Sequence, residues 1–180
     1  MLSFKKSFLG GFMKKILLLV LTSLLFASCN NNNGKVYKIA TTTGDFSGFE
    51  GFDTDKAKIK AIHDAGFKYI DLSLYSLTKD HDYFKNDWKE KILDLKAYAD
   101  DLGVEFVQAH SQGGNSNSDN EAEVDFIVES TLKSLEICGI LGIKSTVVHA
   151  GVNAKYSKEE WLEANKKFYD RLLPTAEKYG

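Results

Sequence analysis

Proline and cysteine are scarce in this chain of 180 residues, which contains one proline and two cysteines. The single proline, Pro174, should kink the helix predicted around it or end its regular part. Two cysteines allow at most one disulfide, and Cys138 falls on the apolar face of a predicted helix, where a small buried residue fits. The sequence also lacks an unbroken apolar run of about 20 residues, the length that crosses a bilayer.

The longest apolar run, residues 16–27, has instead the length of a signal-peptide core, and Lys14 and Lys15 precede it. It ends in Phe26-Ala27-Ser28-Cys29, followed by four asparagines. This arrangement resembles a bacterial lipoprotein signal, in which a cysteine after small residues is lipidated and becomes the new N-terminus. The alternative is an ordinary cleaved signal with an incidental cysteine at position 29.

The resemblance implies a division of the chain into three parts. We expect a signal peptide over residues 1–28, a lipidated Cys29 with a polar tether over 29–35, and a folded domain over 36–180. Because a lipidated Cys29 is unavailable, Cys138 would have no partner for a disulfide. The expected location is the bacterial cell envelope, with the protein held on the membrane by its lipid and facing the periplasm or the exterior.

The balance of charge argues against a nucleic-acid partner. Removal of residues 1–28 takes away four lysines and no acid, which leaves 19 basic and 25 acidic residues and a formal charge of −6. Such a protein repels phosphate backbones. We therefore expect no binding to nucleic acid.

Four glycines divide the remaining chain into even lengths. Gly66, Gly103, Gly142 and Gly180 are 37, 39 and 38 residues apart, and each closes an amphipathic helical stretch. The first three are followed at once by strand-like runs, FKYIDLSL, VEFVQAH and IKSTVVHA. A fixed period of helix, glycine and strand is typical of repeated βα units.

The predicted order is βαβαβαβα, with strands over residues 36–43, 68–74, 105–110 and 144–149. Such alternation predicts a parallel sheet with right-handed crossovers. We favour an α/β fold that is a parallel (βα)4 unit, the N-terminal half of a (β/α)8 TIM barrel, in which a fifth strand would follow Gly180. An open doubly wound sheet is the alternative, but no GxGxxG pattern follows the first strand.

The helix starts also carry recognisable patterns. Asp87 with Glu90, and Ser157 with Glu160, have the spacing of capping boxes, in which each side chain bonds the backbone N–H of the other residue. We expect both pairs to begin helices.

Two of the predicted strands end in histidine, His110 and His149. Strand ends form the catalytic face of a parallel barrel, so two imidazoles there could ligate one metal or position a sugar hydroxyl. Asp71, near the end of the second strand, could face the same cavity or make only a local hydrogen bond. Phe46 and Phe49, in the loop after the first strand, could stack on a sugar ring or plug the barrel mouth.

These motifs resemble the xylose-isomerase-like TIM barrel superfamily. VQAHS followed 39 residues later by VVHAG, with LGIKSTVVHAG after a long helix, is similar to that group, and DAGFKYIDLS fits its second strand. The group includes sugar and sugar-phosphate isomerases and epimerases, inosose dehydratase and type IV apurinic endonucleases. The resemblance covers about residues 36–180, the N-terminal half of such a barrel.

The resemblance implies a metal-dependent isomerase or epimerase that acts on a small carbohydrate or keto-sugar by proton transfer next to a carbonyl. A divalent metal (Mn, Mg, Co or Zn) is expected for the full-length protein, with His110 and His149 as metal ligands or substrate contacts. The C-terminal half-barrel would supply most ligands, so we expect residues 36–180 alone to be inactive. The alternatives are a carbohydrate-binding lipoprotein without turnover and, less favoured, an endonuclease-like metal phosphodiesterase.

Overall fold

The computed structural model describes residues 37–180, and residues 38–180 form one compact unit. The predicted signal peptide, Cys29 and the tether therefore lie outside the described residues. Among the helices of the described part, none is both long and apolar enough to cross a membrane. The elements, in chain order, are β1 (Ala40–Thr42), the 3-10 turn η1 (Thr43–Phe46), α2 (Asp55–Asp64), β2 (Tyr69–Ser73), η2 (Asp82–Phe84), α3 (Trp88–Leu102), β3 (Glu105–His110), α4 (Glu121–Leu141), β4 (Thr146–Val147) and α5 (Lys158–Tyr179).

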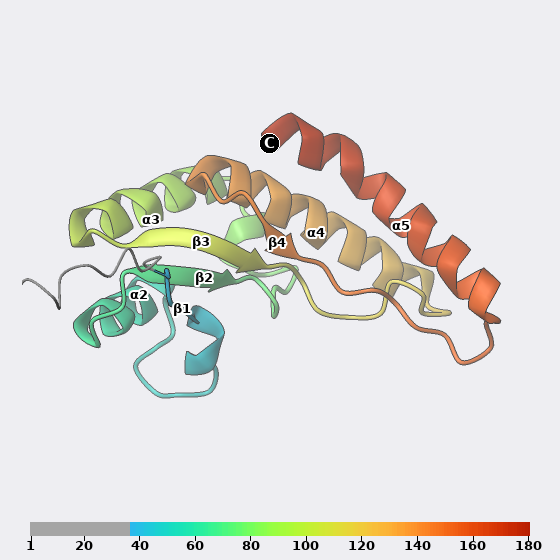
Figure 1. The fold of residues 1–180 in the computed structure, drawn as a ribbon, viewed down its shortest axis with the longest axis horizontal. Coiled ribbons are helices and arrows are strands. Elements are labelled where there is room, and N and C mark those ends of the chain that lie inside the picture. The colour runs from blue at the N-terminus through green and yellow to red at the C-terminus, as the bar shows by residue number, and fades with distance from the viewer. Residues whose placement is uncertain (1–36) are drawn as a thin grey trace, which may run out of the picture. The chain divides into compact units, whose positions relative to one another are not determined.

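The four strands form one parallel sheet in the order β1-β2-β3-β4, with helices alternating between them (Figure 1). This confirms the predicted fold, half of a TIM barrel. The two outer strands are shorter than predicted, at three residues for β1 and two for β4. Each pairs with one neighbour only within residues 37–180, so half of its backbone groups have no strand to bond.

The predicted helix ends are confirmed in most cases. Gly103 and Gly142 adopt left-handed backbone angles, with φ of 68° and 77°, and end α3 and α4. Ser157 and Glu160 form the predicted capping box of α5.

Two details of the helices differ from the predictions. Asp87 makes no side-chain cap at the start of α3, because its carboxylate lies 3.4 Å from the ammonium of Lys91 instead. Pro174 does not end α5, which continues to Tyr179. Pro174 and Asp170, whose carbonyl loses a helical bond, are both exposed, so water can satisfy that carbonyl.

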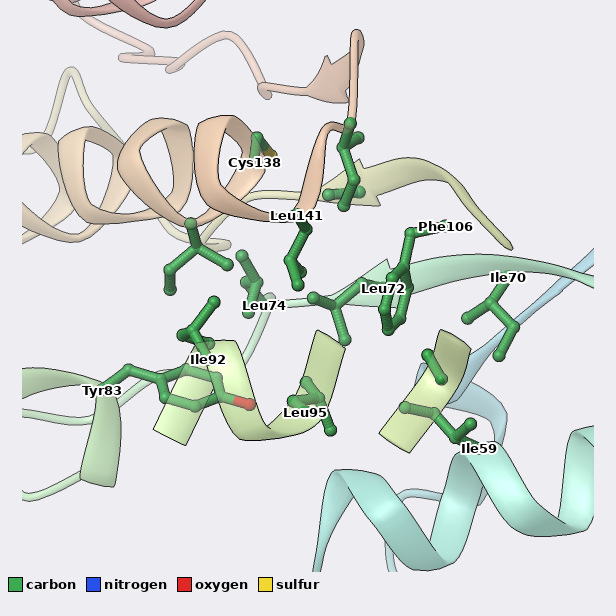
Figure 2. Packing of buried hydrophobic residues seen from close by; sticks show 14 of the residues in the cluster. Ile59, Ile70, Leu72, Leu74, Tyr83, Ile92, Leu95, Phe106, Cys138 and Leu141 are labelled. Carbon is green, nitrogen blue, oxygen red and sulfur yellow. The ribbon is translucent and has the colours of Figure 1, made fainter. Parts of the chain in front are cut away.

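The hydrophobic core lies between one face of the sheet and the helices α2, α3 and α4. Figure 2 shows part of it, with Leu72 of β2 and Leu74 just after that strand beside Ile92 and Leu95 of α3. Cys138 is a free, buried thiol in the same cluster, and burial raises its pKa to about 11. Since the core occupies the helix side of the sheet, polar residues of β2 and β3 lie on the opposite face.

Candidate functional site

Asp71 is held on the polar face of the sheet by its place in β2. Its neighbours Ile70 and Leu72 are fully buried on the helix side, so strand alternation turns Asp71 the other way. Its carboxylate accepts a hydrogen bond of 2.9 Å from Nε2 of Gln108. The two carboxylate oxygens lie 2.8 and 3.0 Å from Nδ1 of His110. Asp71 is 9% exposed, so these partners compensate for the loss of water around its charge.

A bulge in the pairing of β2 with β3 creates this contact. Ile70 pairs with Phe106, but Asp71 pairs with Gln108, so Val107 is the extra residue. Phe106 therefore packs into the core, while Gln108 and His110 turn to the face that carries Asp71. Without this extra residue, strand alternation would put Phe106, Gln108 and His110 on one face.

His149 follows β4 and reaches the same edge of the sheet. Its ring centroid lies 6.4 Å from that of His110, and both side chains are accessible to solvent. The ring of Tyr75 meets that of His149 edge to face, with centroids 5.7 Å apart. The structure thus brings together the three polar candidates from the sequence, Asp71, His110 and His149, and adds Gln108 and Tyr75, which sequence reasoning missed. We call these five residues the histidine cluster.

Close backbone packing fixes the loops around this cluster. The ring of Tyr75 lies where a side chain on Gly113 would begin, since a Cβ there would sit 2.2 Å from the ring carbon Cζ. The backbone N–H of Gly113 donates to the carbonyl of Tyr75 at 2.9 Å. A side chain at position 113 would therefore push the Tyr75 ring away from its place beside His149.

The loop after His149 is held by a dense hydrogen-bond junction at Gly151. The carbonyl of Gly151 accepts from Nδ2 of Asn117, Nε1 of Trp161 and Nδ2 of Asn165, at 3.0, 2.7 and 3.0 Å. Its N–H donates to Oδ1 of Asn165 at 2.8 Å. Gly151 was part of the VVHAG motif, but its partners Asn117 and Asn165 come from segments that no spacing rule connects to it.

Phe46 and Phe49 lie apart from the histidine cluster, at the ends of β1 and β2. Phe46 is half-buried against the core and packs on Phe52, with ring centroids 4.7 Å apart, whereas Phe49 is 63% exposed. Both line a cleft of about 470 Å³. One phenylalanine of this loop thus packs against the core, and the other is open to solvent.

Three titratable residues of the same cleft form a linked group that the sequence did not reveal. The Tyr83 hydroxyl, which is buried, donates a short hydrogen bond to the carboxylate of Asp55. Burial and the Asp55 charge raise the pKa of Tyr83 far above its usual range. His81 packs on the Tyr83 ring at 4.6 Å, and its Nδ1 accepts the backbone N–H of Tyr83 at 3.2 Å. Burial lowers the pKa of His81, which keeps the ring neutral at pH 7.

Within residues 37–180, neither His63 nor a cluster of metal ligands adds to this site. His63 is an exposed residue of α2 that pairs with Asp64. Within residues 37–180, no three histidine, cysteine or acidic side chains converge as a metal site would require. The Asp71 carboxylate is already bonded to His110 and Gln108. The described residues therefore do not form a complete metal site, although His110 and His149 remain candidates for single ligands.

Comparisons with known proteins agree with this fold. The Xylose isomerase-like TIM barrel family model matches residues 59–180. No curated protein sequence matches the chain. A D-tagatose 3-epimerase-like protein superposes with a TM-score of 0.60 at 19% identity, over 80% of this chain and 50% of that one.

Two further solved structures give the same picture. The 3-keto-D-glucoside 4-epimerase from E. coli has a TM-score of 0.56 at 16% identity, covering 79% of this chain and 53% of its own. A D-psicose 3-epimerase has a TM-score of 0.51 at 13% identity, covering 78% and 50%. The chain thus spans about half the length of these structures. With its four βα units and a family match over two-thirds of its residues, this chain belongs to the xylose isomerase-like TIM barrel family.

Proposed function

We propose that this chain is part of a sugar epimerase or isomerase, and that the histidine cluster binds a small carbohydrate or keto-sugar. The observation that carries the proposal is the contact of Asp71 with His110 at the carboxyl edge of the sheet. The ring centroid of His149 lies 6.4 Å from that of His110. This edge is the catalytic face of parallel barrels. The similarity to sugar epimerase structures supports the choice of a carbohydrate, as a likeness of fold.

The residues of the cluster have distinct roles in this proposal. Asp71 holds the His110 ring through Nδ1, so Nε2 is the nitrogen that can bond a substrate hydroxyl. His149 contacts a second oxygen of the same sugar, and the edge of Tyr75 fixes its ring. These contacts orient the sugar so that the carbon next to its carbonyl faces a base.

Proton transfer itself needs a group that this cluster lacks. The Asp71 carboxylate is engaged by two donors and is not a free base. We propose that the C-terminal half of the barrel supplies the carboxylate base and the ligands of a divalent metal (Mn, Mg, Co or Zn). An open groove of about 350 Å³ between α4, β4 and α5, with a mainly apolar lining that includes Leu135, Leu172 and Leu173, fits the packing of further barrel elements beside β4.

Solvent isotope exchange tests the reaction class. The gene product that contains this chain is incubated with ketohexoses in D2O, and deuterium at the carbon next to the carbonyl is followed by NMR. We expect His110→Ala and His149→Ala to lower the exchange rate at least about 100-fold, as for other positioning and acid–base residues. His63→Ala, an exposed histidine on α2, is the matched control and should exchange at the wild-type rate.

A carbohydrate-binding protein without turnover is the second candidate, because the Asp71 carboxylate is tied up and residues 37–180 hold no converging metal ligands. Binding of a ketohexose with no exchange in the full gene product would favour it. A phosphodiesterase of the endonuclease type is disfavoured by the formal charge of −6 after residue 28.

We also propose that the protein is a lipoprotein of the bacterial cell envelope, anchored at Cys29. The support is the sequence pattern before Cys29. Cells grown with a labelled fatty acid should label the wild-type protein and not a Cys29→Ala variant. Equal labelling of both would contradict the anchor.

A further inference from the structure

We propose that the cleft beside Phe49 binds a second sugar ring, so that the ligand of this protein is a disaccharide or another glycoside rather than a free monosaccharide. This inference rests on the proposed function of the histidine cluster. The cleft, about 470 Å³, is bounded by the β1–α2 loop, the start of α2 and the segment that leads into η2. We call it the aromatic cleft.

Ser73 lies between the aromatic cleft and the histidine cluster. This residue lines the cleft, and it pairs in register with His110 across β2 and β3. Ser73 lies two residues beyond Asp71 on β2, so strand alternation puts its side chain on the same face as Asp71. A ligand held by His110 can therefore extend past Ser73 into the aromatic cleft without crossing the sheet.

The chemistry of the lining fits a neutral polyhydroxylated ring. Phe49 is exposed, and Phe46 with Phe52 forms a tilted aromatic pair on the same loop. Aromatic faces pack against the C–H faces of sugars, while nearby polar groups bond their hydroxyls. Of the charged residues in the lining, three are acids (Glu50, Asp53 and Asp55) and only Lys58 is basic. This balance disfavours a phosphorylated or otherwise anionic ligand.

His81 provides a donor of fixed orientation in this cleft. Because its Nδ1 accepts the backbone N–H of Tyr83, the neutral ring carries its hydrogen on Nε2. The Tyr83 ring packs on one side of it, and the Tyr83 hydroxyl is anchored on Asp55. A donor held in place in this way can select a hydroxyl at one position of the second ring.

Paired sugar titrations test the inference. The full chain, in detergent micelles and with labelled histidine and aromatic side chains, is titrated by NMR with glucose and fructose and with cellobiose, maltose and sucrose. We expect at least one disaccharide to bind about tenfold more tightly than its component sugars, the gain from one stacked ring. That disaccharide should shift the resonances of both His149 and His81.

Variants then test whether the tighter binding of the disaccharide depends on the aromatic cleft. Phe49→Ala and His81→Ala should abolish the difference between disaccharide and monosaccharide. Phe67→Ala removes a partly exposed phenylalanine just before the opposite end of β2 and should preserve it. Since Phe49 is largely exposed, its loss should leave the thermal unfolding midpoint unchanged, which separates lost binding from lost folding.

The outcomes separate this inference from the proposed function. If monosaccharides shift His149 and disaccharides bind no more tightly, the second-ring site is overturned and the proposed function stands. If a disaccharide shifts His81 while no sugar shifts His110 or His149, the cleft binds carbohydrate but the proposed function fails. If no disaccharide binds, the inference is overturned.

Discussion

The packing around β2 and β3 differs sharply from that around β4 and α5. The first region is built around seventeen buried residues, most of them on β2, β3 and the helices α2, α3 and α4. In the second region, α4 and α5 meet through four buried residues, Ile127, Val128, Phe168 and Leu172. β4 contributes only two residues to the sheet. His110 and His149 are therefore supported by regions that bury different numbers of residues.

This contrast shows that the two histidines are positioned by different physical means. His110 belongs to a central strand and is fixed by Asp71 within a buried framework. His149 lies beyond a two-residue strand, and its loop is fixed mainly by hydrogen bonds at Gly151. Hydrophobic burial stabilises the first position, and a local polar network stabilises the second.

Replacing one buried leucine in each region with alanine should give the largest difference in stability between the two regions. Leu72→Ala removes a fully buried side chain at the centre of the larger core and should lower the free energy of unfolding by about 3–4 kcal/mol. Leu172→Ala should cost about 2 kcal/mol, because Leu172 borders the groove between α4 and α5, where neighbours can relax. Urea denaturation measures both. Equal losses would mean that the two regions are equally well packed.

Replacement of Gly151 and of Gly139 by alanine should give the next largest difference in stability. A Cβ on Gly151 would lie 2.4 Å from Oγ of Ser116 and 2.5 Å from the backbone N of Asn117, so Gly151→Ala should cost about 2 kcal/mol and displace His149. The equivalent atom on Gly139 would lie 2.3, 2.7 and 2.8 Å from Cδ1, Cγ and Cβ of Tyr179 near the end of α5, and it would meet no backbone atom of another segment.

The gain of about 1 kcal/mol in helix propensity should offset part of the cost of Gly139→Ala, so this substitution should be less destabilising than Gly151→Ala. Thermal denaturation, together with the NMR shift of His149, checks the pair. A Gly139→Ala protein less stable than Gly151→Ala would contradict the assigned roles.

The smallest expected effect is a pH dependence at His81. Burial lowers its pKa despite Asp55 and Asp82 nearby, so the folded state favours the neutral ring. This stabilisation is present above the ordinary histidine pKa of about 6.5 and is lost as pH falls below that value. Protonation would also remove the bond from the Tyr83 N–H.

We expect the wild-type protein to lose more stability than His81→Gln between pH 7.5 and pH 5.5, as measured by urea midpoints. An NMR titration that gives His81 a pKa above 6.5 would refute the assignment.

The fold could be predicted from the sequence because glycine spacing, helix caps and apolar runs are local properties. Gly103 and Gly142 close their helices as predicted, and both adopt left-handed backbone angles. The capping pattern at Asp87 failed because a carboxylate can choose an ion pair with Lys91 over the backbone, and spacing does not distinguish the two.

The geometry of the candidate site was only partly predictable. Strand ends indicated Asp71, His110 and His149, but not the bond between the first two, since it depends on the bulge at Val107. Gln108 gave no signal, because simple alternation assigns it to the face of Phe106. The link of Tyr83 to Asp55 joins residues 28 apart through tertiary packing, which periodicity does not encode.

The bulge at Val107 has a consequence for how the sheet can be covered. By turning Gln108 and His110 toward Asp71, it gives the face opposite the helices a row of hydrogen-bonding groups. An apolar layer placed there would strip water from a carboxylate and an imidazole without replacing it. Only a layer of strands, ligand or ordered solvent that brings its own donors and acceptors can cover this face. The extra residue Val107 therefore restricts which groups can pack against the sheet on the side away from the helices.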